Sequence, residues 1–251
     1  GVPIAPAPYS APSAYYFPRS PRMVAIEVAK GPAAIKYGPQ TVAGALGMHS
    51  TPIPGTPGDG LAGELDLTRG EFGTWRARGI VGGWSEAQGA FDVGASIETL
   101  QEQSEGFKEL DSGGDTGFRI QDYVAKLAFR SKAGAARPQS LELKLQYSDE
   151  DSDETYLGLA LDDFRADPYR RYRASQLDNM QVEHQTWQAT HRIDFTPSVG
   201  LTTLAYYTST ARAWYKLNDV RNAADTGYVS LSTILADPAA YQVEYAALVG
   251  E

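Results

Sequence analysis

The pattern of apolar and polar side chains changes near residue 60 of the chain. Beyond that point apolar and polar residues alternate, which is the period of a β-strand with two different faces. In the clearest run, 141–148, three leucines and a tyrosine alternate with Glu, Lys, Gln and Ser. Such runs predict seven strands, at about 61–68, 72–84, 91–98, 123–130, 141–148, 181–195 and 199–213.

The predicted strands are long, and the links between them alternate in length. Several strands run to roughly 10–15 residues, against about 5–6 in most globular sheets. After a brief first link at 70–71, short links at 86–89, 133–137 and 196–198 alternate with long ones at about 102–116, 153–180 and 214–251. An outer-membrane barrel sorts its links in this way, with short turns on one rim and long loops on the other. A half-solvated soluble sheet explains the two-faced strands but not the sorted links.

Residues 1–60 differ in composition from the rest of the chain. They carry 11 of the 15 prolines, and each proline removes a backbone hydrogen-bond donor. We expect a short strand at 23–28, tight turns around one helical turn at 31–40, and a linker at 50–58. In the long loops, the aspartate–proline pairs at 167–168 and 237–238 predict the starts of two short helices.

Composition narrows the function classes. The 251-residue chain has no cysteine, three histidines and a formal net charge of −9. These counts exclude disulfides, thiolate zinc sites, iron–sulfur clusters and a cysteine nucleophile, and they do not support a histidine-rich metal centre. No basic block indicates nucleic-acid binding, and no apolar stretch reaches the ~18 residues of a transmembrane helix. His184 and His191 lie an odd number of residues apart on one predicted strand, so they face opposite sides and do not share a metal.

Catalytic chemistry is not indicated. The carboxylate pairs Asp149/Asp151 and Asp162/Asp163 could serve as acid and base, as in glycoside hydrolysis. They lie in an acidic loop, however, without an apolar pocket that would raise the pKa of one of them. The chain has no G-x-S-x-G turn for a serine nucleophile. We therefore expect no enzyme activity, no resident metal and no cofactor.

Two groups of residues are candidates for ligand contact. The densest basic cluster of this acidic chain consists of Arg165, Arg170, Arg171 and Arg173. Guanidinium groups bind carboxylate and phosphate through paired hydrogen bonds, so the cluster is a candidate anion site. The alternative is a solvated loop helix whose arginines pair with neighbouring aspartates.

Two sets of aromatic residues are further candidates for contacts with a ligand or a membrane. For those of the proline-rich opening, Tyr9, Tyr15 and Tyr16, ligand contact and packing against the sheet are equally ordinary. Four others in the strand region fit an aromatic girdle at a membrane boundary: Trp75, Trp187, Tyr207 and Trp214.

One segment carries a longer and more specific pattern. Residues 26–46 read IEVAKGPAAIKYGPQTVAGAL. This run resembles the second half of the plug of TonB-dependent outer-membrane receptors, in particular the ferric dicitrate transport receptor branch. Residues 1–9, 152–159 and 164–172 are similar to the same branch, so the resemblance spans nearly the whole chain. Residues 47–50 depart from the family, which commonly has Asn before the final plug strand.

The resemblance implies a mainly β fold with two parts. Residues 1–56 would be the C-terminal half of the plug domain. Residues 57–251 would be the N-terminal part of an antiparallel transmembrane β-barrel with long extracellular loops, about 7 of an expected 22 strands. The implied function is import of a ferric chelate, either ferric dicitrate or another siderophore, across the outer membrane of a Gram-negative bacterium. The implied partners are TonB, the Fe(III) chelate and outer-membrane lipid.

The resemblance also assigns candidate residues. Matching the apical plug loops gives the ligand-binding candidates Tyr9, Ser10, Tyr15, Tyr16 and Gln40, beside the four arginines chosen on electrostatic grounds. Because the chain begins without a Met or a signal segment and ends in mid-pattern, we expect a fragment without the TonB box. The alternatives are a passive porin or adhesin barrel and a secreted β-rich hydrolase. The plug-like segment argues against the first and the sorted links against the second.

Overall fold

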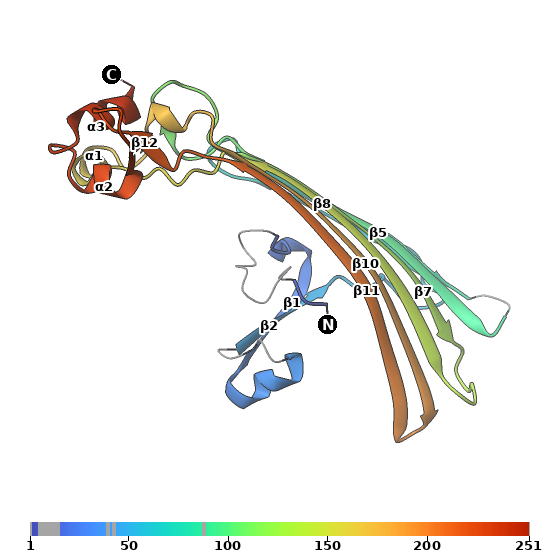
Figure 1. Cartoon of the computed structure of the whole chain (residues 1–251). Coiled ribbons are helices and arrows are strands. Elements are labelled where there is room, and N and C mark those ends of the chain that lie inside the picture. Colours follow the sequence, from blue (N-terminus) through green and yellow to red (C-terminus); the bar gives the residue numbers. More distant parts are fainter. Residues whose placement is uncertain (1, 5–15, 39–40, 42–43, 87–88, 251) are drawn as a thin grey trace.

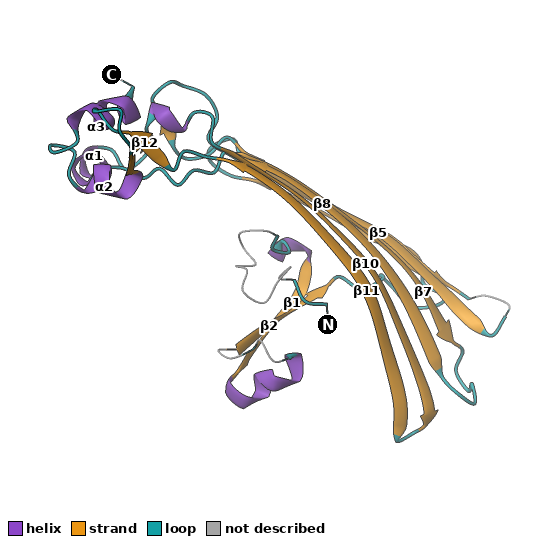
Figure 2. Ribbon diagram, viewed as in Figure 1, coloured by secondary structure: helices purple, strands orange, loops and turns teal. Residues whose placement is uncertain are grey.

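The computed structural model describes residues 2–4, 16–38, 41, 44–86 and 89–250. It is mainly β, with 53% strand and 14% helix, and its largest element is an antiparallel sheet of seven strands (Figures 1 and 2). In order across the sheet these are β3 (Gly60–Arg69), β4 (Trp75–Ser85), β5 (Phe91–Ser104), β7 (Phe118–Ser131), β8 (Gln139–Ser152), β10 (Asn179–Thr196) and β11 (Val199–Tyr215). All seven predicted strands are confirmed.

The sheet is an open curved wall with two unlike ends. β3 and β11 form its edges and do not pair with each other within the described residues. The links β4–β5, β7–β8 and β10–β11 are short turns at one end. The links β5–β7 and β8–β10 and the chain after β11 gather at the other end (Figure 1). The predicted sorting of the links is therefore confirmed.

The face that a side chain takes follows the parity of its residue number. Every pairing from Gly60 to the bulge after Asp194 joins even to even and odd to odd residues. Even-numbered side chains line the concave face, which N-terminal residues cover (Figure 1). Large apolar side chains on the odd face are exposed, among them Leu61, Leu65, Leu67, Val81, Ile97, Leu127, Leu143, Leu145, Trp187, Leu201 and Tyr207.

Residues 16–59 form a small N-terminal module on the concave side. Its antiparallel hairpin consists of β1 (Met23–Lys30) and β2 (Gly44–Ser50), with the 3₁₀ turns η2 (Ser20–Arg22) before it and η3 (Gly31–Tyr37) between the strands. Gly44 has φ +151°, and a Cβ there would lie 2.8 Å from the Ala29 carbonyl oxygen, so the close pairing of the hairpin requires glycine. The strand, the helical turn and the irregular linker predicted for this region are confirmed.

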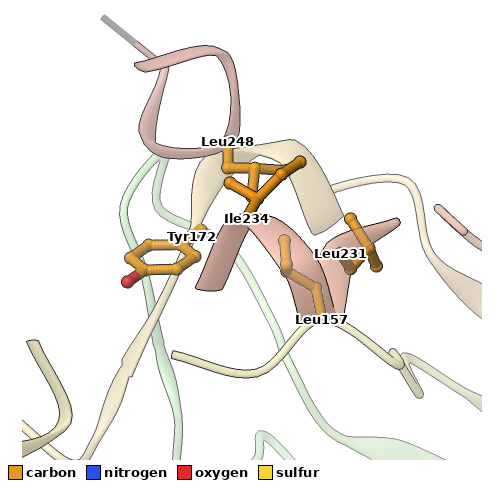
Figure 3. Packing of buried hydrophobic residues seen from close by; sticks show 5 residues of the cluster. All are labelled: Leu157, Tyr172, Leu231, Ile234 and Leu248. Carbon is orange, nitrogen blue, oxygen red and sulfur yellow. The ribbon is translucent and has the colours of Figure 1, made fainter. Parts of the chain in front are cut away.

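The long loops gather at one end of the wall as a loop lobe, defined as residues 105–117, 153–178 and 216–250. Its elements are β6 (Glu109–Leu110), α1 (Leu161–Ala166), β9 (Arg170–Arg171), η4 (Arg173–Ser175), β12 (Asp219–Arg221), β13 (Tyr228–Ser230), α2 (Leu231–Ala236) and α3 (Gln242–Val249). Five buried side chains from distant segments form its core (Figure 3): Leu157, Tyr172, Leu231, Ile234 and Leu248. The lobe therefore has an apolar core of its own. Within the described ranges, no helix combines the length and the apolar character needed to cross a membrane.

The two predicted helix starts are wrong. Both aspartate–proline pairs follow a helix instead of opening one, because Asp167 and Asp237 are the C-caps of α1 and α2. Each carboxylate accepts from a backbone N–H just downstream, Asp167 from Tyr169 at 2.9 Å and Asp237 from Ala240 at 3.1 Å. An aspartate that holds a turn in this way uses the same chemistry as a helix cap, so the local sequence alone does not separate the two.

The lobe core generates a stability prediction. Ile234 is fully buried, so Ile234→Ala should lower the local free energy of unfolding by about 2–5 kcal/mol. Val243 lies in the same lobe with 63% of its surface exposed, and Val243→Ala should change little. Hydrogen exchange of the backbone amides in 231–249 measures both. Equal exchange rates in the two variants would contradict this account of the core.

Candidate functional site

A line of polar contacts joins the N-terminal module to the concave face. The most buried of them is an ion pair in which Arg22 Nε donates to Asp122 Oδ2 at 2.7 Å, and both side chains are fully buried. Burial alone would lower the pKa of Arg22, but the charge and the hydrogen bond of the Asp122 carboxylate raise it above its ordinary value. The guanidinium group is therefore charged in an interior position. One nitrogen of Arg22 and one oxygen of Asp122 are buried without a hydrogen-bond partner among the described residues.

Tyr16 lies beside this ion pair and is itself buried. Its ring stacks on His184 with the centroids 3.8 Å apart and the planes 4° from parallel. Its hydroxyl accepts from Gln146 and, at 3.3 Å, from Arg22. Burial raises the pKa of Tyr16, so the phenol stays neutral. The sequence left ligand contact and packing against the sheet open for Tyr16, and the structure shows packing against the sheet.

Further contacts extend in both directions from the Arg22–Asp122 pair. Toward the loop lobe, Arg19 pairs with Glu150 at 2.7 Å. Toward the β3 edge, Arg78, which is in register with Asp122 through Leu100, bridges Glu98 on β5 and the Thr51 hydroxyl of the module, at 2.9 and 3.0 Å. Beyond them the contact becomes apolar, with Ile53 packed against Trp84 and Ala128. The segment from Ser50 to Pro54 thus runs along the concave face as a strap.

The four loop arginines have separate partners and do not form one cluster. Arg165 is exposed on α1 and pairs with Asp162, while Arg170 forms a fork with Asp111 and also reaches Asp163. Arg171 is buried, where it donates to Ser175 and to the Asp153 carbonyl oxygen, and burial lowers its pKa. Arg173 is exposed and lies against Gly250. Arg170 and Arg171 therefore hold the lobe together, and Arg165 and Arg173 are the two exposed members.

Asp163 is the polar centre of the lobe. It accepts from the hydroxyls of Tyr172 and Tyr245 and pairs with Arg170 at 3.2 Å. Burial alone would raise the pKa of Asp163, but these two hydrogen bonds and the guanidinium group lower it below its usual range. Burial and the same carboxylate raise the pKa values of both tyrosines. One carboxylate thus ties together segments 153–178 and 216–250.

An aromatic and cationic cluster lies where the wall meets the lobe. Trp214 and Tyr156 meet edge to face with centroids 4.7 Å apart, and Lys216 Nζ lies 3.3 Å from the Tyr156 ring centroid. A hollow of about 380 Å³ adjoins Lys216. Trp214 has an even number and donates to the Glu154 carbonyl oxygen, so the expectation that it joins the outward-facing aromatic residues is wrong. Exposed rings beside an ammonium group can hold planar or anionic groups.

Other candidates are placed as follows. Tyr9, Ser10, Tyr15 and Gln40 lie outside the described residues. His184 and His191 fall on opposite faces of β10, as predicted. Across the part of the chain that the structure describes, no three His, Asp or Glu side chains gather in a way that could hold a metal ion.

Sequence reasoning missed the module–wall contacts. Arg22 and Asp122 are 100 residues apart, and nothing local in either segment points to the other. A usable signal did exist, because Asp122 and Lys126 are charged residues an even number of positions apart in one alternating strand and must lie on one face. The segment that covers that face cannot be identified from the sequence.

No family model, no curated protein and no solved structure matches this chain.

The buried pair generates a second prediction. Arg22→Met leaves the Asp122 carboxylate buried and unpaired, so the free energy of unfolding should fall by about 3–5 kcal/mol. Arg19→Met breaks a partly exposed pair and should cost about 0–1 kcal/mol. The double variant Arg22→Met/Asp122→Leu should recover most of the loss. Denaturant titration compares the three, and a double variant no more stable than Arg22→Met would argue against a charge-based contact.

The Asp163 centre generates a pH prediction. Its pKa is lowered in the folded lobe, so the stabilisation is present above the unfolded value of about 3.9 and disappears as pH falls through the lower folded value. Proteolysis of the lobe should accelerate below about pH 4. In Tyr172→Phe/Tyr245→Phe this acid dependence should be smaller. Asp162→Asn, at a side chain that is 95% exposed, is the matched control and should behave as wild type.

Proposed function

We propose that this chain is part of a TonB-dependent outer-membrane receptor that binds and imports a ferric chelate without catalysing a reaction. The observation that carries the proposal is the sorting of side chains on the seven-stranded wall. Its odd face presents exposed leucine, isoleucine, valine and aromatic side chains, while its even face holds buried charges against the N-terminal module. Lipid outside and a polar, filled interior produce this pattern.

The odd face is unfavourable in water and favourable in lipid. Soluble monomers rarely expose contiguous apolar patches of more than a few hundred Å². Here each of the seven strands carries at least one such side chain, for example Leu65 on β3, Leu145 on β8 and Trp187 on β10. Against hydrocarbon they need no cover. The exposed aromatic residues Trp187 and Tyr207 on this face fit the proposed membrane boundary.

The parts of the molecule map onto the proposed receptor as follows. Residues 1–56 correspond to the second half of the plug, and residues 57–251 to the first strands of the barrel. The short turns lie on the periplasmic side and the loop lobe on the extracellular side. In lipid the unpaired edges of β3 and β11 would each leave a row of unsatisfied backbone groups, so the proposal requires further strands to close the barrel.

Transport then consists of binding followed by release. The chelate binds at the extracellular end, where Arg165 and Arg173 are exposed on the lobe. Tyr9, Ser10, Tyr15 and Gln40 remain predicted plug contacts. A ligand shifts the plug between conformations only through its different affinity for them, and pulling by TonB selects the conformation that releases it inward. The polar contacts between the module and the wall are those that such a movement must break.

Radiolabelled ferric citrate uptake tests the proposal. Iron-starved cells that carry the complete gene should take up the label only when TonB is present. Arg165→Gln/Arg173→Gln should weaken uptake about tenfold or more, since each lost charged hydrogen bond is worth about 1.5–3 kcal/mol. Arg170 and Arg171 stay unchanged because they hold the lobe. Arg192→Gln, an exposed arginine at the opposite end of the wall, is the matched control.

Each alternative gives a different result. Uptake that persists without TonB indicates a passive barrel. No uptake of ferric citrate, although the protein reaches the outer membrane, excludes the dicitrate assignment and directs the search to other chelates. Unchanged uptake in Arg165→Gln/Arg173→Gln would show that residues other than these two arginines contact the ligand.

A further inference from the structure

Two lysines on the concave face form an unusual pair. Lys126 on β7 and Lys144 on β8 are direct cross-strand partners, so their side chains leave the wall side by side. Both ammonium groups donate to one hydroxyl oxygen, Ser50 Oγ, at 3.1 and 3.3 Å. Lys126 also donates to the Thr51 carbonyl oxygen at 2.7 Å. Two cations thus converge on a single neutral oxygen at the start of the strap.

Among the described residues, neither of the two ammonium groups has a carboxylate counterion in direct contact. Like charges directly opposite each other on a sheet are destabilising. Within the described residues no carboxylate lies within 4.0 Å of either ammonium group. Glu98 acts on both through space, but its Oε1 is held by Arg78 and Thr51. Glu142 also acts only from a longer distance. Lys126 is only 7% exposed, so water screens this repulsion poorly.

The position of the pair is as informative as its charge. Lys126 lies nearer to the short-turn end of β7 at Ser131 than to the lobe end at Phe118, and Lys144 lies nearer to Gln139 than to Ser152. The pair therefore lies between the Arg22–Asp122 contact and the short-turn end of the wall, which is the side toward which an imported ligand would leave. Among the described residues of the module, Ser50 and Thr51 accept hydrogen bonds from it.

We propose that Lys126 and Lys144 form an anion-binding station on the wall, which the strap closes in this state. When the strap moves away, the two ammonium groups bind an anion whose oxygens replace Ser50 Oγ and the Thr51 carbonyl oxygen. Carboxylate-rich or phosphate-bearing cargo has this chemistry, because one such group offers several oxygens to two donors. The proposal rests on the proposed function for the cargo, but the anion site itself does not depend on it.

The first experiment tests the site without any transport. In purified full-length Ser50→Ala the shared oxygen is absent, and inorganic phosphate should take its place between the two lysines. Phosphate should raise the melting temperature of this variant by about 2 °C or more relative to chloride at equal ionic strength. Wild type should respond less, and Ser50→Ala/Lys144→Met should not respond. Equal responses to phosphate and chloride in Ser50→Ala would overturn the anion site.

The second experiment tests its role in import. Cells with the full-length Lys126→Met/Lys144→Met receptor should bind ferric citrate at the surface as wild type does but take it up about tenfold more slowly. Lys132→Met, which removes one positive charge near the end of the same strand pair, is the control. Unchanged uptake in the double variant overturns the role in import. If wild type itself takes up no ferric citrate, the proposed cargo fails while the phosphate result still decides the anion site.

Discussion

The parity of strand register is the constraint on which the rest of the structure depends. From Gly60 to Asp194 every strand pair joins residues of equal parity, so one rule assigns all side chains of the wall to a face. A slip of one residue in any pair would turn leucines inward and charges outward beyond that point. Asp122 meets Arg22 only because this rule holds across β7. The same rule leaves Leu145 and Trp187 exposed on the other face.

The module is held to the wall by polar contacts more than by an apolar core. A buried ion pair gains little net stability over apolar residues of the same shape, because desolvation offsets most of the attraction. Breaking it without a replacement partner is costly. An interface of this kind fixes one docked position firmly, yet water or an anion can satisfy the same groups after separation. Among the described residues, Ile53, packed on Trp84 and Ala128, adds a small apolar contact near the end of the strap, and the Tyr16 ring stacks on His184. In the proposed receptor, such an interface suits a module that has to leave its site.

Local patterns predicted what depends on local physics. The strands follow from alternation within 8–15 neighbouring residues, and the links from proline, glycine and charge between them. The two misplaced helices show the limit, since Asp167 and Asp237 satisfy turns after helices with the oxygen that would cap a helix start. The arginine cluster shows a second limit. Arg170 donates to Asp111, which lies 59 residues earlier in the chain, and no pattern in either segment predicts this contact. Of the predicted contact residues, the structure places Tyr16 in the interior because His184 and Gln146 offer it a stack and a hydrogen bond.

The two ends of the wall are stabilised by different forces, and this difference bears on how a ligand would be handled. At the lobe, apolar burial around Ile234 and the charges around Asp163 act on the same segments, so the lobe should move as one unit. At the strap, Lys126 and Lys144 repel each other beneath the neutral Ser50 hydroxyl, so the docked state carries an unfavourable term that the proposed anion would remove. In the proposed mechanism, withdrawal of the strap would then be easier when anionic cargo is present to occupy the site. A cargo that relieves repulsion under the strap would thereby favour the state in which it is released.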